Sequence, residues 1–312
     1  MNLQLLSQMI LAERVDRNHA SWNNIAGELK NSLAGAGGEA RVLALLKREL
    51  DLEPAPLFFT DLSFPNKEGF SQVDLLLLHP NFVCVLEVKN MRGDFYFNSE
   101  NFQFHRIVDG RVEGMRNPEW QLHRAMKAAE KYLGVPVSGA IVLANRSGRV
   151  VEGPKIHPVL SLDYLPFHIE SLVYKTNAFD VEGLAARLRD LPKGSFPNNL
   201  LERHQLSIDS LRLGVTCPNC RTVALERKNR KWHCAKCGGF FQDAHEVTLQ
   251  EYAVLFGREL PTRFAYQLLR VEDKYLLYRL LEKSALQGNE RGKRWIVPRV
   301  ELLEAYFSSI YR

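Results

Sequence analysis

Two Cys-x-x-Cys pairs are the plainest chemical signal in the 312-residue sequence. The four cysteines are Cys217, Cys220, Cys234 and Cys237, with 13 residues between the pairs. This spacing is typical of a zinc ribbon, in which four thiolates close a tetrahedral structural Zn²⁺ site and leave no open position for catalysis. A redox pairing of the cysteines is the alternative. His233 and His245 are spare ligand candidates that a four-cysteine site does not need.

Acidic side chains and a lysine come together on two neighbouring strand-like runs. If these runs form a hairpin that closes at His79 to Phe82, cross-strand pairing places Asp74 opposite Glu87. Because side chains alternate between the two faces of a strand, Glu87 and Lys89 project together. We therefore expect two carboxylates and an ammonium group to meet at the end of an apolar ladder. A register slip of one residue would move Asp74 to the other face.

Two like charges this close need a proton or a cation to offset their repulsion. Carboxylate oxygens with retained waters are what Mg²⁺ prefers, and phosphate is its usual further ligand. Lys89 can then orient or help to deprotonate a metal-bound water and stabilise a phosphorane-like transition state. The alternative is a strand end that turns toward solvent, with Glu87 and Lys89 merely hydrated. The apolar run and the facing Asp74 favour the metal site.

The elements that must position these groups mix helices and strands. Strand-like runs cover Leu57 to Phe64, Gln72 to Leu78, Phe82 to Lys89, Asp94 to Phe97, Phe102 to Val108 and Gly139 to Ala144. Helical spacing covers Leu3 to Leu50 in two or three segments with a break at Gly35 to Gly38, then Pro118 to Leu133 behind an Asn117 cap, and Val181 to Leu191. This order predicts a mixed α/β domain.

Four short motifs follow one another along this part of the chain. They are Gly35-Ala-Gly-Gly-Glu39, Gln72-Val-Asp74, Leu86-Glu-Val-Lys-Asn90 with Gly93 beyond it, and Asn117-Pro-Glu-Trp-Gln121. In this order they resemble the nuclease-related (NERD) domain proteins, a branch of the PD-(D/E)XK nuclease superfamily, in the Bacillus-type form with a C-terminal zinc ribbon. The resemblance implies a restriction-endonuclease-like mixed sheet flanked by helices. It also implies Mg²⁺ or Mn²⁺ held by Glu39, Asp74 and Glu87, a water assisted by Lys89, and Gln121 lining the site.

Other interpretations of single residues stay open. Glu39, near the start of its expected helix, also suits the helix dipole. Asp61 and Asp94 are further carboxylates that can substitute for any of the three proposed metal ligands. Cys84 alternates away from Glu87, and we expect it to be a buried apolar residue.

Positive charge gathers in the last third of the chain. Residues 1–200 carry 22 basic and 23 acidic side chains, residues 201–245 carry 8 and 4, and residues 246–312 carry 11 and 9. Basic side chains beside an aromatic ring suit a phosphate backbone with base stacking. The candidates are Arg227, Lys228, Arg230, Lys231 and Trp232 between the cysteine pairs, and Arg291, Lys293 and Arg294 on a small wing after a helix-turn-helix-like order in residues 262–297. A solvated hairpin tip and ordinary surface charge are the alternatives.

The expected organisation has five parts: a helical N-terminal extension (1–34), a nuclease-like domain (35–192), a linker (193–213), a zinc ribbon (214–245) and a small helical, winged-helix-like domain (246–312). No apolar run reaches the roughly 20 residues of a membrane span, and the first residues lack signal-peptide features, so we expect a cytoplasmic location. The predicted function is metal-dependent hydrolysis of phosphodiester bonds in DNA, with RNA as another substrate class. The rival hypothesis is a nuclease fold without catalysis that binds nucleic acid or serves as a scaffold.

Overall fold

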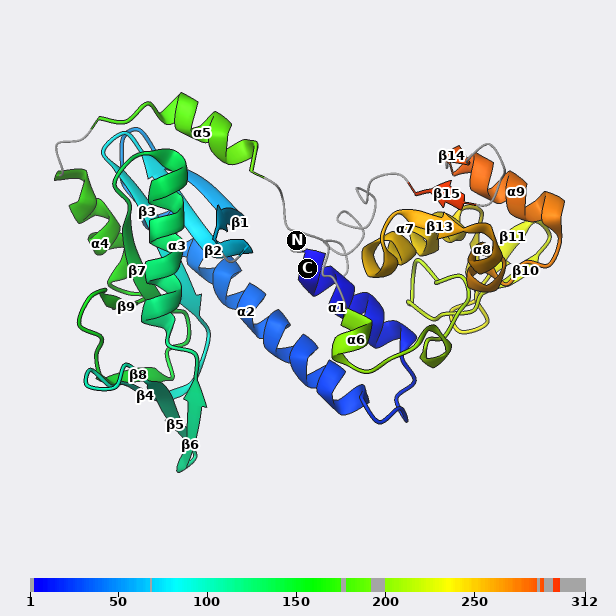
Figure 1. The fold of residues 1–312 in the computed structure, drawn as a ribbon, viewed down its shortest axis with the longest axis horizontal. Helices are drawn as coiled ribbons and strands as arrows, with labels where there is room; N and C mark the ends of the chain where they lie inside the picture. The colour runs from blue at the N-terminus through cyan, green and yellow to red at the C-terminus, as the bar shows by residue number, and fades with distance from the viewer. Residues whose placement is uncertain are drawn as a thin grey trace. The chain divides into compact units, whose positions relative to one another are not determined.

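The computed structural model describes residues 3–67, 69–174, 178–191, 200–284, 287–288 and 294–297. The chain divides into two compact units (Figure 1). Unit 1 comprises Met1–Asn31 and Ser195–Arg312, and unit 2 comprises Ser32–Gly194. Residues 193–199 of the predicted linker lie outside the described residues. Among the described helices, none is long and apolar enough to cross a membrane.

The larger sheet of unit 2 is mixed, with five strands in the order β1-β2-β3-β7-β9. The strands are β1 (Leu57–Asn66), β2 (Gly69–His79), β3 (Phe82–Lys89), β7 (Ser138–Leu143) and β9 (Val159–Ser161). The first three pair antiparallel, whereas β3, β7 and β9 pair parallel. The β2–β3 hairpin pairs Leu75 with Leu86 and closes with His79 opposite Phe82, so the register expected from the sequence is confirmed.

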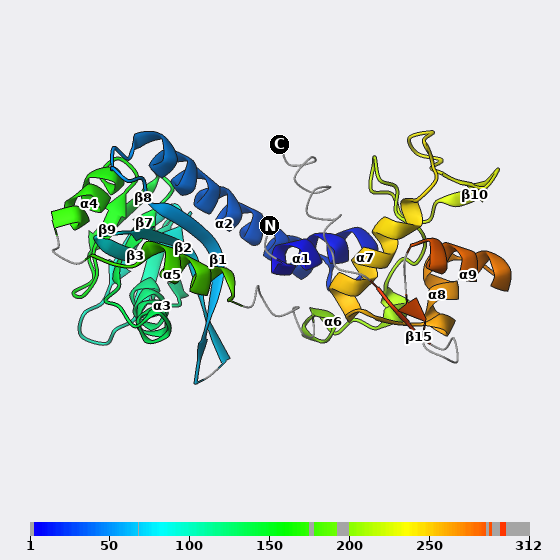
Figure 2. The ribbon, with the colours of Figure 1, turned by 90° about the horizontal axis from the view of Figure 1, so that it is seen from above.

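Helices cover both faces of this sheet (Figure 2). They are α2 (Trp22–Glu49), α3 (Pro118–Leu133), α4 (Leu165–Ser171) and α5 (Val181–Arg189). On one face, Val42 and Leu46 of α2 share a core with α4. On the other face, Leu122 of α3 and Leu184 of α5 belong to a second core. Because β3 is covered on both sides, it is apolar at nearly every position, and the predicted mixed sheet flanked by helices is confirmed.

Helix α3 has a recognisable signal at each end. Its bounds are those expected from the sequence, with Pro118 in the first turn. Asn117 Oδ1 accepts a hydrogen bond from the backbone N–H of Glu119 at 2.9 Å. Gly134 ends the helix with a φ of 74°, in the left-handed region that glycine adopts at low cost.

The Gly-rich segment does not break the N-terminal helix, contrary to expectation. Helix α2 continues from Trp22 to Glu49, so Glu39 lies in its interior rather than near its start. Gly35 and Gly37 have open space where a Cβ atom would stand, whereas a Cβ atom on Gly38 would lie 2.6 Å from Asn90 Cβ. Each glycine costs a helix about 1 kcal/mol, which packing of an apolar helix face against a sheet can offset.

A smaller four-stranded sheet follows β3, in the order β6-β5-β4-β8. Its strands are β4 (Gly93–Phe97), β5 (Phe104–Val108), β6 (Arg111–Met115) and β8 (Gly148–Glu152). The sequence predicted β4 and β5 but not β6 or β8. Strand β6 is exposed at every position, so no burial pattern marks it in the sequence.

Unit 1 joins α1 (Leu3–Arg14) to the C-terminal elements. These are α6 (Leu200–Arg203), β10 (Glu226–Lys228), β11 (Lys231–His233), β12 (Phe240–Phe241), α7 (Ala244–Phe256), β13 (Glu259–Pro261), α8 (Thr262–Leu269), α9 (Lys274–Lys283), β14 (Gln287–Gly288) and β15 (Arg294–Ile296). Two three-stranded antiparallel sheets form, β10-β11-β12 around the cysteines and β13-β15-β14 after the helices. The expected small cysteine-bearing sheet and C-terminal helices are therefore present. Leu6 and Ile10 of α1 pack with Val254 of α7.

A buried ionic network ties α1 to these later elements. Glu251 of α7 is fully buried, and its carboxylate receives Arg14 Nη2 at 2.6 Å and Arg221 Nη2 at 2.5 Å. Thr216 Oγ1 donates to the same carboxylate at 2.7 Å. Burial alone would raise the pKa of Glu251, but the two guanidinium groups prevail and lower it. The carboxylate is therefore held ionised inside the unit.

Candidate functional site

The end of β3 carries an ion pair between the two residues that were expected to project together. Lys89 Nζ lies 2.6 Å from Glu87 Oε1, and the two side chains are 21% and 8% exposed. Glu87 stands beside Ile141 of the neighbouring strand β7, within the sheet. The alternative of a hydrated strand end is therefore wrong for Glu87.

Asp74 stands on β2 beside this ion pair. The hairpin register places Asp74 opposite Glu87, one step beyond the last paired residues. Asp74 Oδ2 accepts a hydrogen bond from the backbone N–H of Val88 at 2.9 Å. This bond fixes the Asp74 carboxylate against β3.

The acidic side chains at this place repel one another. Burial, followed by the carboxylates of Glu87 and Glu39, raises the pKa of Asp74 to about 8, although Lys89 acts in the opposite direction. Burial also raises the pKa of Glu39, and the charges of Asp61 and Glu87 add to this effect. At neutral pH the cluster therefore binds a proton that a cation could displace.

Helix α2 brings Glu39 to this cluster through two contacts with the sheet. Asn90, which directly follows Lys89, donates from Nδ2 to the backbone carbonyl of Ala34 at 2.7 Å. Arg41 Nη1 donates to the carbonyl of Ala144 at 2.6 Å. Asn90 belongs to one of the sequence motifs, but the motif does not indicate that its side chain holds α2.

Of the other two carboxylates, Asp61 lies beside this cluster and Asp94 is paired in the smaller sheet. Asp61 is on β1 opposite Asp74, with a φ of 54°, between residues paired in regular register. Asp94 forms an ion pair with Arg149 at 2.8 Å in the smaller sheet. Gln121 lies in the first turn of α3, and its Oε1 is buried without a hydrogen-bond partner among the described residues.

A divalent cation fits the donor chemistry of this cluster, but the ligands are not assembled. Within the described ranges, the four cysteines alone form a group of three or more potential ligands that can hold a metal ion as they stand. Glu39, Asp74 and Glu87 do not form such a group, and Lys89 takes up one Glu87 oxygen. Carboxylates that repel one another are nevertheless the donors that a hard cation such as Mg²⁺ would neutralise.

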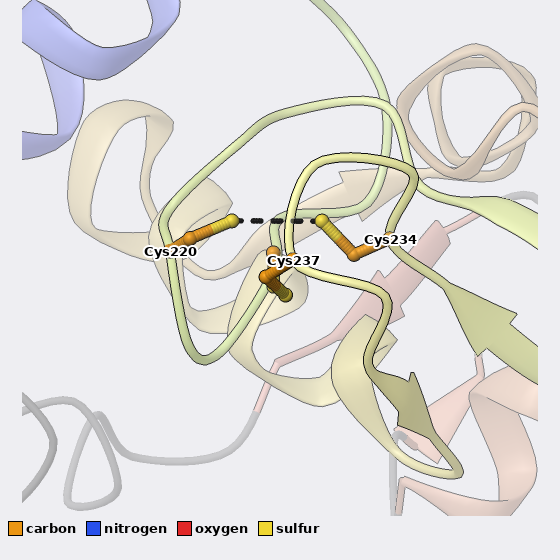
Figure 3. Close-up of side chains that lie close together, drawn as sticks. Cys220, Cys234 and Cys237 are labelled. Atoms are coloured by element: carbon orange, nitrogen blue, oxygen red, sulfur yellow. Dashed lines mark hydrogen bonds between the residues drawn. The ribbon is translucent and has the colours of Figure 1, made fainter.

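The four cysteines meet the requirements of a structural zinc site (Figure 3). Cys217 Sγ lies 3.6 Å from Cys237 Sγ, and Cys220 Sγ lies 3.5 Å from Cys234 Sγ. All four sulfur atoms lie within 4.8 Å of one another. Tetrahedral coordination with Zn–S bonds of about 2.3 Å spaces the sulfurs about 3.8 Å apart. The sulfur positions therefore lie within about 1 Å of the separations that a tetrahedral Zn²⁺ site requires.

Neither spare histidine belongs to this group. His245 is buried and accepts a hydrogen bond from Trp232 Nε1 at 3.3 Å. The ring of His233 packs against Phe240, with ring centroids 4.5 Å apart.

The basic candidates for nucleic-acid contact are only partly as expected. Arg227, Lys228, Arg230 and Lys231 lie on or between β10 and β11, at the surface or partly exposed. Trp232 is 1% exposed, so the expected stacking on a base is wrong for this residue: its ring fills the core instead. Arg294 on β15 forms an ion pair with Glu259 at 2.6 Å, and Arg291 and Lys293 lie outside the described residues.

Comparison with protein families finds a match in the part of the chain that contains the Asp74–Glu87–Lys89 cluster. Residues 34–159 match the family model described as the nuclease-related domain, NERD. This range contains the larger sheet except its last strand, all of the smaller sheet, and the Asp74–Glu87–Lys89 cluster. The match indicates a nuclease-related function, and the resemblance to the nuclease-related domain, drawn from the motifs, is confirmed for residues 34–159. Comparisons with curated proteins and with solved structures found no match.

Proposed function

We propose that the chain is a metal-dependent deoxyribonuclease of the PD-(D/E)XK type, with its active site at the end of β3 and the middle of β2. The observation that carries this proposal is the row of Asp74 and Glu87 on adjacent strands with Lys89 Nζ 2.6 Å from Glu87. The nuclease-related match over residues 34–159 supports the reaction class. The raised pKa of Asp74 supports a cation as the missing neutralising charge.

Each residue then has a distinct role. Mg²⁺ or Mn²⁺, when bound, supplies Lewis-acid polarisation of the phosphate and a more acidic water. Glu39, Asp74 and Glu87 would hold the cation, and Asp74 would bind it in its deprotonated form. Lys89 orients the attacking water and stabilises negative charge on the phosphoryl oxygens. Gln121, whose buried Oε1 is unpaired among the described residues, lines the site from α3.

The cysteine-bearing sheet and the C-terminal helices take the role of holding the nucleic acid. Four cysteines close the structural zinc site and leave no position for substrate. The hairpin between the two cysteine pairs carries four basic side chains, Arg227, Lys228, Arg230 and Lys231. Their charge suits a phosphate backbone.

A cleavage assay with matched carboxylate variants tests the active site. Purified protein is incubated with single- and double-stranded DNA and RNA in Mg²⁺ or Mn²⁺. Asp74→Asn and Lys89→Met should each lower the cleavage rate by roughly 100-fold or more. The control is Asp94→Asn, because Asp94 pairs with Arg149 in the smaller sheet and should leave cleavage unchanged. DNA should be cleaved in preference to RNA.

A second measurement does not depend on activity. Because burial and neighbouring carboxylates disfavour the charged form of Asp74, Asp74→Asn should raise the thermal midpoint of the metal-free protein at pH 8 and above. Cleavage that survives both Asp74→Asn and Lys89→Met would rule out the site. Nucleic-acid binding without cleavage in either metal would instead support the rival, a nuclease fold that only binds.

A further inference from the structure

Arg227 of the β10–β11 hairpin and Arg279 of α9 carry positive charge on two elements that share one core. Arg227 of β10 lies over the ring of Trp232, with its Cζ 5.0 Å from the ring centroid. Trp232 belongs to the same buried core as Leu277 and Leu280 of α9. Both ribbon views draw the hairpin beside α9 (Figures 1 and 2). The hairpin and the helix therefore present one continuous surface within unit 1.

The charge of this pair is not neutralised by the described part of the chain. Partial burial, followed by the charge of Arg279, lowers the pKa of Arg227. Arg227 Nη1 is buried without a hydrogen-bond partner, while Nη2 donates to the carbonyl of Arg230 at 2.8 Å. Among the described residues, neither Arg227 nor Arg279 has a carboxylate partner. A phosphate at the exposed side of either guanidinium group would offset this positive charge.

Helix α9 has the position of a groove-binding helix. It follows α8 after a short turn, and the β14–β15 ladder comes after it. In a helix-turn-helix the second helix lies in the major groove of duplex DNA. Asp273 caps α9 by accepting from the backbone N–H of Leu276 at 2.5 Å, so the helix is well formed from its first turn.

The outer face of α9 is free to meet such a groove. Tyr275 is 84% exposed, and Arg279 and Glu282 follow it at helical spacing on the exposed side. Lys274 is exposed in the first turn of α9, on the row that continues to Tyr278, with Nζ 5.7 Å from the ring centroid of Tyr278. The inner face is buried through Leu277, Leu280 and Leu281. The exposed face therefore offers an aromatic ring and charged side chains of both signs rather than a second apolar seam.

We propose that α9 and the β10–β11 hairpin form a binding surface for duplex DNA, in which the outer face of α9 enters the major groove, Arg279 holds a backbone phosphate, and the exposed cations of the hairpin contact the phosphates beside it. The proposal rests on the proposed function in taking DNA as the ligand, but it does not require cleavage. Duplex DNA is favoured over double-stranded RNA because the deep, narrow major groove of A-form RNA does not admit a helix. A single strand has no groove for α9 to occupy.

Fluorescence anisotropy in the absence of Mg²⁺ and Mn²⁺ tests the surface separately from cleavage. The full-length, zinc-loaded chain is titrated into a labelled duplex of about two helical turns, and into the matching single strand, over a range of NaCl concentrations. Arg279→Ala should weaken duplex binding about tenfold and lower the salt slope by roughly 1, because one phosphate contact is lost. Glu282→Gln should have the opposite sign and tighten binding, since it removes a negative charge from the same face.

The control variant is Lys30→Ala, which removes an exposed cation from the α2 part of unit 1 and should leave affinity within about twofold. Zinc content and the thermal midpoint of each variant confirm that it folds. An Arg279→Ala protein with unchanged affinity and salt slope would overturn the proposal. A wild-type protein that prefers the single strand, or a Glu282→Gln change that weakens duplex binding, would overturn it as well. If the wild-type protein binds duplex DNA but does not cleave it in Mg²⁺ or Mn²⁺, only the proposed nuclease function is contradicted.

Discussion

A single added methyl group should separate the two glycines that precede Glu39. Gly37 has open space around the position of a Cβ atom, so Gly37→Ala should stabilise α2 by about 1 kcal/mol through helix propensity. At Gly38 the new Cβ atom would lie 2.6 Å from Asn90 Cβ and 3.4 Å from Ala144 Cβ. Asn90 Cβ is attached directly to the backbone beside β3 and cannot rotate away.

The expected magnitude follows from these contacts. Overpacking costs about 1 to 3 kcal/mol, which is set against a propensity gain of about 1 kcal/mol, so Gly38→Ala should be neutral to destabilising by about 2 kcal/mol. The two neighbouring substitutions should therefore differ by about 1 to 3 kcal/mol. Because Gly38 precedes Glu39, the shift of the helix should also displace Glu39 from Asp74 and lower cleavage at least tenfold.

Hydrogen exchange measured by mass spectrometry reports this difference in stability for unit 2, which contains both glycines. Peptides from α2 and β3 should lose protection in Gly38→Ala and gain it slightly in Gly37→Ala. Cleavage by Gly37→Ala should match the wild-type rate. Equal protection and equal cleavage in the two variants would refute the close approach of helix and strand, and with it the account of how Glu39 is positioned.

Two further predictions concern unit 1. Arg14→Met should destabilise it by about 3 to 5 kcal/mol, because Glu251 loses a buried partner at 2.6 Å, whereas the double variant Arg14→Met/Glu251→Leu should recover most of this loss in urea unfolding. A double variant no more stable than the single one would contradict the pairing. Burial lowers the pKa of His245 to about 4, so the stability from its neutral form is complete above about pH 6.5 and falls by about 3 kcal/mol as the pH drops to 4. His245→Gln should flatten this part of the stability profile, and an unchanged slope would show that other groups cause it.

The hairpin and the position of its acidic residues could be predicted from the sequence because their signals are local. The apolar run and the short connection at His79 to Phe82 fix the register, and with it the place of Asp74 opposite Glu87. Helix α3 was equally predictable, since Asn117 and Pro118 mark its start. The grouping of the four cysteines could be predicted from their spacing alone.

Other features depend on contacts that no local pattern encodes. The continuity of α2 through Gly35 to Gly38 depends on packing against the sheet, which overrides a propensity that disfavours helix. Trp232 looked like an exposed ring among cations, but the core it fills comes partly from α9, more than 40 residues later in the chain. The role of Asn90 was hidden because its partner, the carbonyl of Ala34, lies 56 residues earlier.

Because unit 1 is built from two separate stretches of sequence, its parts are synthesised at different times. Arg14 meets its partners Arg212 and Glu251 across 198 and 237 residues, so α1 leaves the ribosome long before they exist. At ordinary synthesis rates this interval is roughly 10 to 50 seconds. During it, the whole of unit 2 can emerge and fold, while Leu6 and Ile10 remain without the helix that covers them. Helix α1 is therefore made before the elements that cover it and is packed only after they have been synthesised.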